Sequence, residues 1–298
     1  MRAEYDVLVL GGAGVDTIVH VPELPLPYAD SYLVPGIVTR AGQTGDMVAL
    51  GLHALGLRVH HLDLLGDDPE GELVRALHRE HGVPLTALPH PGGTKRAVNL
   101  VGPDGRRLSL YDGSRGGAPD SLPGPVVAEL ARAGRHVHVS ISHPCADALP
   151  VLRGAGATVS TDLHDWDGRN PYHEDFARQA DLVFLSAAAL ADPEATMRRI
   201  AGYGRARAVV ATAGAAGAHL LVDGTVRHVP PVEPPAPVVD SNGAGDAFAC
   251  GFLYGWLNGE PPARCAEYGA RAGAFACTVP ATRAAFATRA QVAAGAGC

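Results

Sequence analysis

The residues best suited to chemistry lie together between Asp240 and Phe248. This segment reads Asp-Ser-Asn-Gly-Ala-Gly-Asp-Ala-Phe and leads into an apolar stretch with helical spacing. The pattern places Gly243-Ala244-Gly245 at a helix N-terminus, where unpaired backbone N–H groups and the helix dipole form an anion site. Asp246 follows in the first turn, beside that anion, where an acidic residue is also a common helix cap.

Lysine is nearly absent, which excludes two common ways of holding a nucleotide. Of 24 basic residues only Lys95 is a lysine, and it lies in the sequence Gly-Gly-Thr-Lys-Arg. That context matches neither the Gly-Lys-Ser/Thr of a P-loop nor the Val-Ala-Ile-Lys of a protein kinase. Gly11–Gly14 also fails the dinucleotide pattern Gly-x-Gly-x-x-Gly, because Asp16 stands at the third glycine. A nicotinamide-dependent oxidoreductase is therefore a weak alternative.

The 14 histidines and 5 cysteines form no recognisable metal or disulfide framework. The pairs His60-His61, His78-x-x-His81 and His136-x-His138 lack a convergent carboxylate or cysteine set, which favours surface or core histidines over a metal site. The cysteines are odd in number and contain no Cys-x-x-Cys, so neither a disulfide framework nor a structural zinc site is expected.

Composition and charge exclude several further classes of protein. The chain has 298 residues, 47% of them apolar, which is enough for one large core. A net charge of −7 without a basic stripe argues against nucleic acid as a partner. The apolar runs are far shorter than a membrane span of about 20 residues, and the N-terminal run Val7–Leu10 is too short for a signal peptide. We therefore expect a cytoplasmic protein with no membrane partner.

Strand-like and helix-like segments alternate along the chain. Strands are predicted at Asp6–Leu10, Val59–Leu65, Val137–Ser142, Thr158–Leu163, Leu182–Leu185 and Ala208–Thr212. Helices are predicted at Gly42–Leu55, Pro69–His81, Ala146–Arg153 and Pro193–Gly202, and again from the Gly243–Gly245 turn onward. Such alternation is typical of βαβ units, and it predicts a single α/β domain over residues 1–298 with a twisted, mainly parallel sheet and helices on both faces.

Two segments stand outside this alternation. Thr17–Thr39 is rich in proline and β-formers and carries no helical period, so we expect extended structure there. Thr94–Val101 and Arg106–Tyr111 flank the strong turn sequence Gly102-Pro103-Asp104-Gly105 and form a predicted hairpin with one face in water. Together, residues 17–40 and 94–113 are expected to form a small β-appendage, with roughly these bounds.

The Asp240–Asp246 segment resembles the C-terminal signature of the PfkB carbohydrate kinase family, the ribokinase-like sugar kinases. That signature is usually written Asp-Thr-x-Gly-Ala-Gly-Asp, and only Ser241 departs from it. Gly11–Asp16 followed by Val21–Pro25 is similar to the family's first strand, substrate-contacting aspartate and lid entry. Val209–Ala218 is similar to its Thr-x-Gly-x-x-Gly nucleotide turn, and the resemblance extends from Val7 to about Thr278.

The resemblance implies a ribokinase-like fold in which the β-appendage is a lid over the acceptor. It also implies an ATP-dependent kinase that transfers the γ-phosphoryl group to a hydroxyl of a small sugar or sugar derivative. Asp246 corresponds to the catalytic base, and the backbone N–H groups of Gly243, Ala244 and Gly245 correspond to the donors to the transferring phosphoryl group. A nucleoside kinase of the same fold and a non-catalytic ligand-binding relative remain alternatives, although an intact Asp246 argues against the second.

Further residues are assigned only through the resemblance. The expected ATP-binding residues are Thr212, Gly214, Gly217 and Asn242, although the first three could also form an ordinary turn. The expected acceptor-binding residues are Asp16, Gly42 and Asp46, although Asp16 could instead be a capping residue after a strand. Asp240 would help to hold a monovalent cation such as K+, or would stabilise a turn. Mg2+ would arrive as Mg-ATP, and because dimerisation often covers the open strand edges of such a lid, a homodimer through the lid is expected.

The sequence departs from the family pattern in two places. Asp46 replaces the usual substrate-facing asparagine, and an ionised carboxylate accepts hydrogen bonds but donates none. Leu185–Ala189 stands where the family has Asn-x-x-Glu, which organises magnesium and phosphate, and it lacks both functional groups. Magnesium is therefore expected to be held mainly by ATP and water. Asp162-Leu163-His164 stands where some sugar-acid kinases have Asp-x-Asn, and no role is assigned to it.

Overall fold

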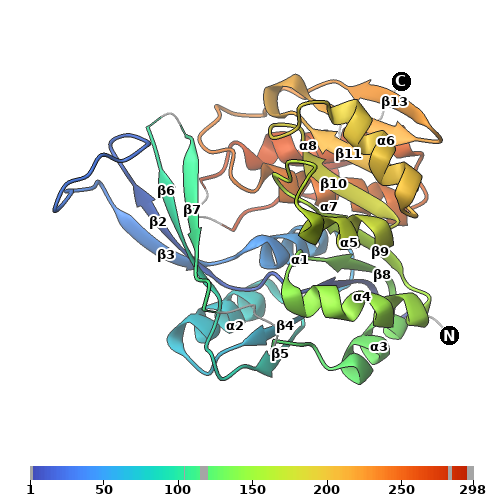
Figure 1. Ribbon diagram of the computed structural model, residues 1–298, viewed down its shortest axis with the longest axis horizontal. Coiled ribbons are helices and arrows are strands. Elements are labelled where there is room, and N and C mark those ends of the chain that lie inside the picture. The colour runs from blue at the N-terminus through green and yellow to red at the C-terminus, as the bar shows by residue number, and fades with distance from the viewer. Residues whose placement is uncertain (1–2, 104, 115–119, 281–283, 294–298) are drawn as a thin grey trace.

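A nine-stranded sheet forms the centre of the fold (Figure 1). The computed structural model describes residues 3–103, 105–114, 120–280 and 284–293. Within these ranges the strand order is β13-β12-β11-β10-β9-β8-β1-β4-β5, and every pairing is parallel except those of β12 with β11 and β13. The strands are β1 (Tyr5–Leu10), β4 (Val59–Leu65), β5 (Leu85–Pro89), β8 (Gly134–Val139), β9 (Thr158–Asp162), β10 (Leu182–Ser186), β11 (Ala208–Thr212), β12 (Ala218–Val222) and β13 (Thr225–Val229). The predicted mainly parallel sheet is confirmed.

Helices cover both faces of this sheet, as predicted. One face carries α1 (Thr44–Ala54), α7 (Ala244–Leu257), α8 (Pro262–Ala276) and α9 (Arg289–Ala293). The other carries α3 (Gly124–Ala133), α4 (His143–Ala155), α5 (Pro171–Gln179) and α6 (Pro193–Tyr203). Val7 and Val9 of β1 pack with the first group, whereas Leu8 and Leu10 pack with the second. Both faces of a central parallel strand are therefore buried, which is why such strands form continuous apolar runs in the sequence.

The remaining four strands form a separate small sheet, which projects from the main body on the left of Figure 1. Its order is β3-β2-β6-β7, with β2 (Val15–His20), β3 (Ile37–Ala41), β6 (Arg96–Val101) and β7 (Arg107–Tyr111). Helix α2 (Pro69–His81) contacts α1 and strands β2 and β3. The extended segment and the predicted hairpin thus build the expected lid, and Leu108 and Leu110 of the hairpin are exposed. Asp104 of the hairpin turn lies outside the described residues.

The topology creates a crevice at one edge of the large sheet. From β1 in the middle, the chain continues to β4 and β5 on one side, whereas β8 and the later strands lie on the other. Connections that leave the carboxyl ends of neighbouring parallel strands in opposite directions open a ligand-binding crevice between them. Within the described ranges, no helix has the length and apolar character needed to cross a membrane.

The histidines of β8 give the fold a testable pH dependence. His136 is buried, its ring nitrogens lie 2.8 Å from the hydroxyls of Thr158 and Ser160, and burial lowers its pKa from 6.5 to about 3. Below pH 6.5 the unfolded chain therefore binds a proton that the folded chain excludes, so this residue destabilises the folded state as the pH falls. We expect the stability advantage of wild type over His136→Gln to shrink by about 1.4 kcal/mol per pH unit from pH 6.5 to 5. Urea unfolding measures this, and a constant difference would contradict it.

Candidate active site

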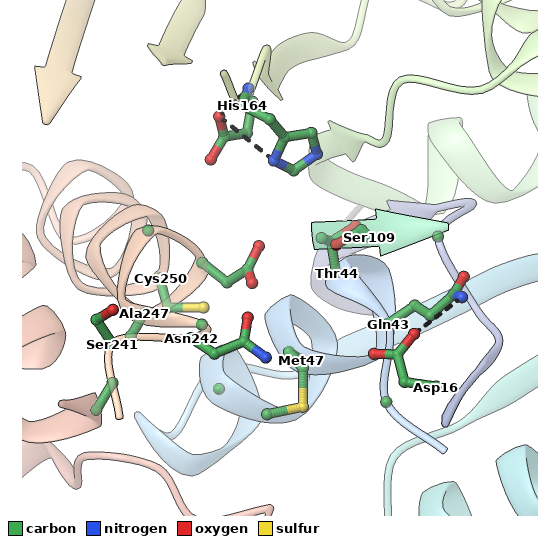
Figure 2. A pocket seen from close by; sticks show the side chains of 18 of the residues that line it. Asp16, Gln43, Thr44, Met47, Ser109, His164, Ser241, Asn242, Ala247 and Cys250 are labelled. Atoms are coloured by element: carbon green, nitrogen blue, oxygen red, sulfur yellow. Dashed lines mark hydrogen bonds and ion pairs between the residues drawn. The ribbon is translucent and has the colours of Figure 1, made fainter. Parts of the chain in front are cut away.

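A cavity of about 1000 Å³ opens where three parts of the fold meet. The ends of the central strands contribute Gly12, Ser140, Asp162, Ser186 and Thr212. The small sheet contributes Asp16, Ile18, Asn99, Arg107 and Ser109, and the start of α7 contributes Asn242, Gly243, Gly245 and Asp246. Figure 2 shows His164 on one side of this cavity, Asn242 on another, and the Asp16–Gln43 pair on a third. Residues from the beginning, middle and end of the sequence therefore share one space.

The start of α7 has the backbone geometry of an anion site. Gly243 precedes the helix with a φ of +79°, a left-handed conformation that favours glycine, and no side chain caps the helix. The first-turn N–H groups of a helix lack intrahelical acceptors, so those of Gly245 and Asp246 remain available to a ligand. Ala244 differs from the prediction: its N–H donates to the Ser241 carbonyl at 3.3 Å, and the residue is absent from the described wall of the cavity.

Asp246 has the electrostatics of a general base. Its half-buried side chain lines the cavity, where burial raises its pKa from 3.8 to about 7. The neighbouring Asp162 carboxylate raises the pKa further, whereas His164, Arg107 and Arg40 lower it. A carboxylate whose pKa lies near neutral pH accepts a proton more readily than an exposed one and is still ionised for much of the time.

Asp16 occupies the opposite side of the cavity, on β2. Its Oδ1 accepts a hydrogen bond from Gln43 Nε2 at 3.3 Å, and its Oδ2 lies 3.9 Å from Nη2 of Arg40. Burial raises the pKa of Asp16 in spite of these two partners. Gly42 lines the cavity beside them. The carboxylate, the carboxamide and the guanidinium together offer the mixture of acceptors and donors that sugar hydroxyls require.

Asp46 does not face the cavity, contrary to the prediction. Its side chain is fully buried, and its Oδ2 accepts from the backbone N–H groups of Gly14 at 3.1 Å and Gln43 at 3.3 Å. These bonds fix the start of α1 against the end of β1, where Gly45 N–H donates to the Gly12 carbonyl at 2.9 Å. A carboxylate suits this place because its Oδ2 has two backbone N–H donors. Its neighbour Gln43 lines the cavity instead.

The buried histidines converge on the same carboxylate, which their spacing did not reveal. His78 Nε2 lies 2.9 Å from Asp46 Oδ1 and 3.2 Å from His61 Nδ1. His61 Nε2 lies 2.9 Å from the carbonyl of Gly11, which assigns the proton of the neutral ring to Nε2. The prediction that no carboxylate converges on these histidines is therefore wrong. Through the Gly11 carbonyl and the Asp46 carboxylate, these histidines help to hold the loop after β1 in place.

The predicted nucleotide residues divide into two groups. Thr212 and Asn242 line the cavity, whereas Gly214 and Gly217 lie in the turn after β11 and are absent from its described wall. Gly217 also has a packing reason to be glycine, because a Cβ there would lie 2.2 Å from the Val229 carbonyl oxygen. Asp240 lines the cavity, and its Oδ1 accepts from Asn242 N–H at 2.8 Å, the turn that was one of its two alternatives.

Sequence analysis did not assign several charged and polar residues of the site. Arg40 and Gln43 flank the Gly42 that was assigned, so their proximity was a usable signal. Arg107 belongs to the hairpin positions 105, 107, 109 and 111 that line the cavity, a period of two that shows which face of β7 looks inward. Asp162 and His164 were noted without a role. His164 has a φ of +53°, and its N–H donates to Asp162 Oδ1 at 2.8 Å, a strained turn of a kind that is concentrated at functional sites.

The sequence resembles known carbohydrate kinases over nearly its whole length. Residues 6–289 match the profile described as pfkB family carbohydrate kinase. An acarbose 7(IV)-phosphotransferase from an Actinoplanes species is 62% identical over 286 residues, which cover 95% of this chain and 96% of that protein. An ATP-dependent ribose-1-phosphate kinase from Halopiger xanaduensis is 29% identical over 281 residues, or 90% of each chain.

Solved structures show the same relationship. A microbiome-derived acarbose kinase, Mak1, has a TM-score of 0.89 and 44% sequence identity, with 98% of both chains covered. The ribokinase of Arabidopsis thaliana complexed with ribose and ATP has a TM-score of 0.80 at 21% identity, again with 98% of both chains covered. The second similarity is one of fold alone, and it confirms the expected ribokinase-like architecture.

The raised pKa of Asp246 predicts how the reaction depends on pH. If this carboxylate accepts the proton, kcat falls below pH 7 by about tenfold per pH unit, because only the ionised form is active. Asp162→Asn removes a negative charge that raises this pKa, so the acid limb of the profile is expected to move to lower pH. Steady-state rates between pH 5 and 9 measure both effects, and a limb that does not respond to Asp162→Asn would contradict the assignment.

Proposed function

Since this chain belongs to the pfkB family of carbohydrate kinases and is an ATP-dependent kinase of sugar derivatives, we propose that its acceptor is acarbose or a close analogue of it. The observation that carries this proposal is the 62% identity to an acarbose 7(IV)-phosphotransferase over 95% of the chain. A cavity of about 1000 Å³ also supports it, because that volume is at the upper end of those found for small-molecule sites. An acceptor larger than one sugar ring and a nucleotide both need room there.

The arrangement of the site supports a direct transfer from ATP to the acceptor hydroxyl. In this proposal Asp16 and Gln43 hold acceptor hydroxyls, and one hydroxyl oxygen attacks the γ-phosphorus while Asp246 accepts its proton. The bond from the γ-phosphorus to the bridging oxygen breaks, and ADP leaves. The N–H groups of Gly245 and Asp246 stabilise the charge on the transferring phosphoryl group, which is the largest contribution that a protein makes to this reaction.

The nucleotide is proposed to lie across the ends of β10 and β11, with its phosphates toward Asn242 and Gly243. Thr212 lines the cavity at that edge, and the Gly214–Gly217 turn follows it directly. Asp240 is retained as a proposed ligand of a monovalent cation such as K+, because a carboxylate next to the anion turn suits a cation. These positions leave the Asp16 side of the cavity to the acceptor.

Magnesium is proposed to enter with ATP. At the position of the family's Asn-x-x-Glu motif, Ser186 Oγ accepts from Ala188 N–H at 3.2 Å, and Ala189 offers no ligand atom. This stretch therefore fits a metal poorly. Mg2+ prefers to keep several waters and to bind phosphate oxygens, which does not require a dedicated protein cage.

The overall organisation is proposed to be one kinase domain over residues 1–298, with the small sheet as its lid. A homodimer through that lid also remains a prediction. The outer strands of the small sheet, β3 and β7, are open edges, and Ile37, Leu108 and Leu110 are exposed on them. Such edges are commonly covered by a partner.

The acceptor proposal is tested by incubating the purified protein with ATP and acarbose and following the phosphorylated product by mass spectrometry. We expect stoichiometric formation of phospho-acarbose, and Asp246→Asn should lower kcat by about 10²–10⁴-fold, because the variant keeps the size of the side chain but loses the base. ATP affinity should change little, since the backbone anion site is intact. Phosphorylation of nucleosides or simple sugars in preference to acarbose would contradict the proposed acceptor.

A matched control separates a base from a helix cap. Asp192 caps α6 by accepting from Ala195 N–H at 2.9 Å, and it is absent from the described wall of the cavity. Asn and Asp cap helices comparably, so Asp192→Asn should leave the activity unchanged. If Asp246→Asn were as active as Asp192→Asn, Asp246 would be a cap and not the base.

The magnesium proposal predicts the effect of restoring the missing motif. Ser186→Asn combined with Ala189→Glu supplies the carboxamide and the carboxylate that the family uses. The double variant should need less free Mg2+ for half-maximal rate, because the metal gains protein support through its water shell. A magnesium titration at fixed ATP measures this, and an unchanged requirement would show that the motif has been placed at the wrong positions.

A further inference from the structure

Arg107 links the lid to the anion turn. It is the first residue of β7 in the small sheet, and its Nη1 donates a hydrogen bond to Oδ1 of Asn242, the residue directly before Gly243. Arg107 and Asn242 both line the cavity. The guanidinium of a lid residue therefore lies beside the N–H groups that are proposed to hold a phosphoryl group.

No carboxylate of the described residues lies within ion-pair distance of Arg107, unlike the other cationic side chains of the cavity wall. The other cationic side chains of the cavity wall are held by acidic partners: Arg40 Nη2 lies 3.9 Å from Asp16, and Lys95 Nζ lies 3.1 Å from Asp63. Arg107 makes no ion pair within the described residues and donates to a neutral carboxamide oxygen instead. A guanidinium has five N–H donors, so most of its hydrogen-bonding capacity is left for an anion.

The positive charge of Arg107 acts on groups on both sides of the cavity. Its positive charge lowers the pKa of Asp246 at the start of α7 and the pKa of Asp16 on β2. The charge of Arg107 therefore acts on both the proposed base and the proposed acceptor site.

We propose that Arg107 binds the transferring phosphoryl group, so that closure of the lid completes the phosphate site. This inference rests on the proposed function of the same cavity. Arginine suits the task because its planar fork donates two parallel hydrogen bonds to phosphate oxygens. The carboxamide of Asn242 holds the guanidinium in place until the nucleotide arrives.

The proposal also accounts for the missing acidic motif. Ser186 and Ala189 leave the protein without the side chains that organise magnesium in relatives, so less positive charge is fixed at the phosphates by the main body. Arg107 supplies such charge from the lid. Because the lid also covers the acceptor, full stabilisation is reached only when the site is closed and water is excluded.

The kinetic test compares Arg107→Gln with Arg106→Gln. Both variants remove one positive charge from the same hairpin, but Arg106 is absent from the described wall of the cavity. Removal of one donor to the transition state should lower kcat by about 10²–10³-fold in Arg107→Gln, with a smaller rise in the KM for ATP. Arg106→Gln should stay close to wild type. A kcat within threefold of wild type for Arg107→Gln would overturn the proposal.

A binding test separates this proposal from that of the acceptor. A non-hydrolysable ATP analogue and ADP differ in the γ-phosphate, and calorimetry measures both without any sugar. Arg107→Gln should weaken binding of the analogue by about tenfold, because one charged hydrogen bond is lost, and it should leave the affinity for ADP unchanged. Equal effects on both nucleotides would overturn the proposal. Failure of acarbose as an acceptor would leave this comparison intact.

Chemical rescue distinguishes a phosphate contact from a structural role. Arg107→Ala leaves space for a free guanidinium ion in the cavity. Millimolar guanidinium should then restore part of kcat in Arg107→Ala but not in Asp246→Asn, whereas the same concentration of sodium chloride should have no effect. Absence of rescue in an Arg107→Ala protein that binds ADP normally would count against direct contact with the phosphoryl group.

Discussion

In the proposed reaction, the N-terminus of α7 holds an anion and a carboxylate within one helical turn. A phosphoryl group and the Asp246 carboxylate repel each other, and the repulsion is strong where water is excluded. Two features of the structure reduce it. First-turn N–H groups are available to the anion, and burial with the neighbouring Asp162 raises the Asp246 pKa to about 7, so that in this proposal the carboxylate accepts the proton as the charge moves. The rest of the fold holds these N–H groups and carboxylates in fixed positions relative to one another.

The scaffold fixes α7 through close packing of its backbone. A Cβ at Gly251 of α7 would lie 2.4 Å from the Tyr268 carbonyl oxygen, and a Cβ at Gly269 of α8 would lie 2.8 Å from that of Phe248. Glycines on both helices thus let them approach more closely than larger side chains allow. The start of α1 is held in the same way against the end of β1, where a Cβ at Gly45 would lie 1.9 Å from the Gly11 carbonyl oxygen. Both contacts hold backbone at the edge of the cavity closely against neighbouring backbone.

Elements with clear local end signals could be predicted from the sequence, whereas side-chain directions could not. Asp68, Pro69 and Gly82 define α2 so well that its predicted and observed bounds agree, since a capping carboxylate, an N-terminal proline and a left-handed glycine are local features. Helix α8 has an Ala- and Gly-rich sequence with a weak apolar period, and it was not predicted. The direction of the Asp46 side chain was predicted wrongly, because its hydrogen-bond partners, Gly14 and His78, are distant from it in the sequence.

The strand register of the lid determines which side chains of β7 line the cavity. A shift of one residue in β7 would bring Arg106 to the cavity and turn Arg107 to solvent, because side chains alternate along a strand. The pairings of Val101 with Arg107 and of Asn99 with Ser109 determine which arginine looks inward. No local pattern distinguishes two adjacent arginines in Gly-Arg-Arg-Leu-Ser. The hairpin was therefore predictable as an element, but its contribution to the chemistry was not.

The charges of the cavity fit together only when the lid is counted as part of the site. Five carboxylates of the described residues line it (Asp16, Asp162, Asp165, Asp240 and Asp246), and ATP brings further negative charge. A glutamate at position 189 would add a sixth carboxylate close to the phosphates, and it would be tolerable only with a well-supported metal. With alanine there, repulsion is lower but so is the support for magnesium. In the proposed reaction the phosphate charge is then met by helix N–H groups in the main body and by guanidinium groups at the lid, so that the small sheet would be a chemical component of the site as well as its cover.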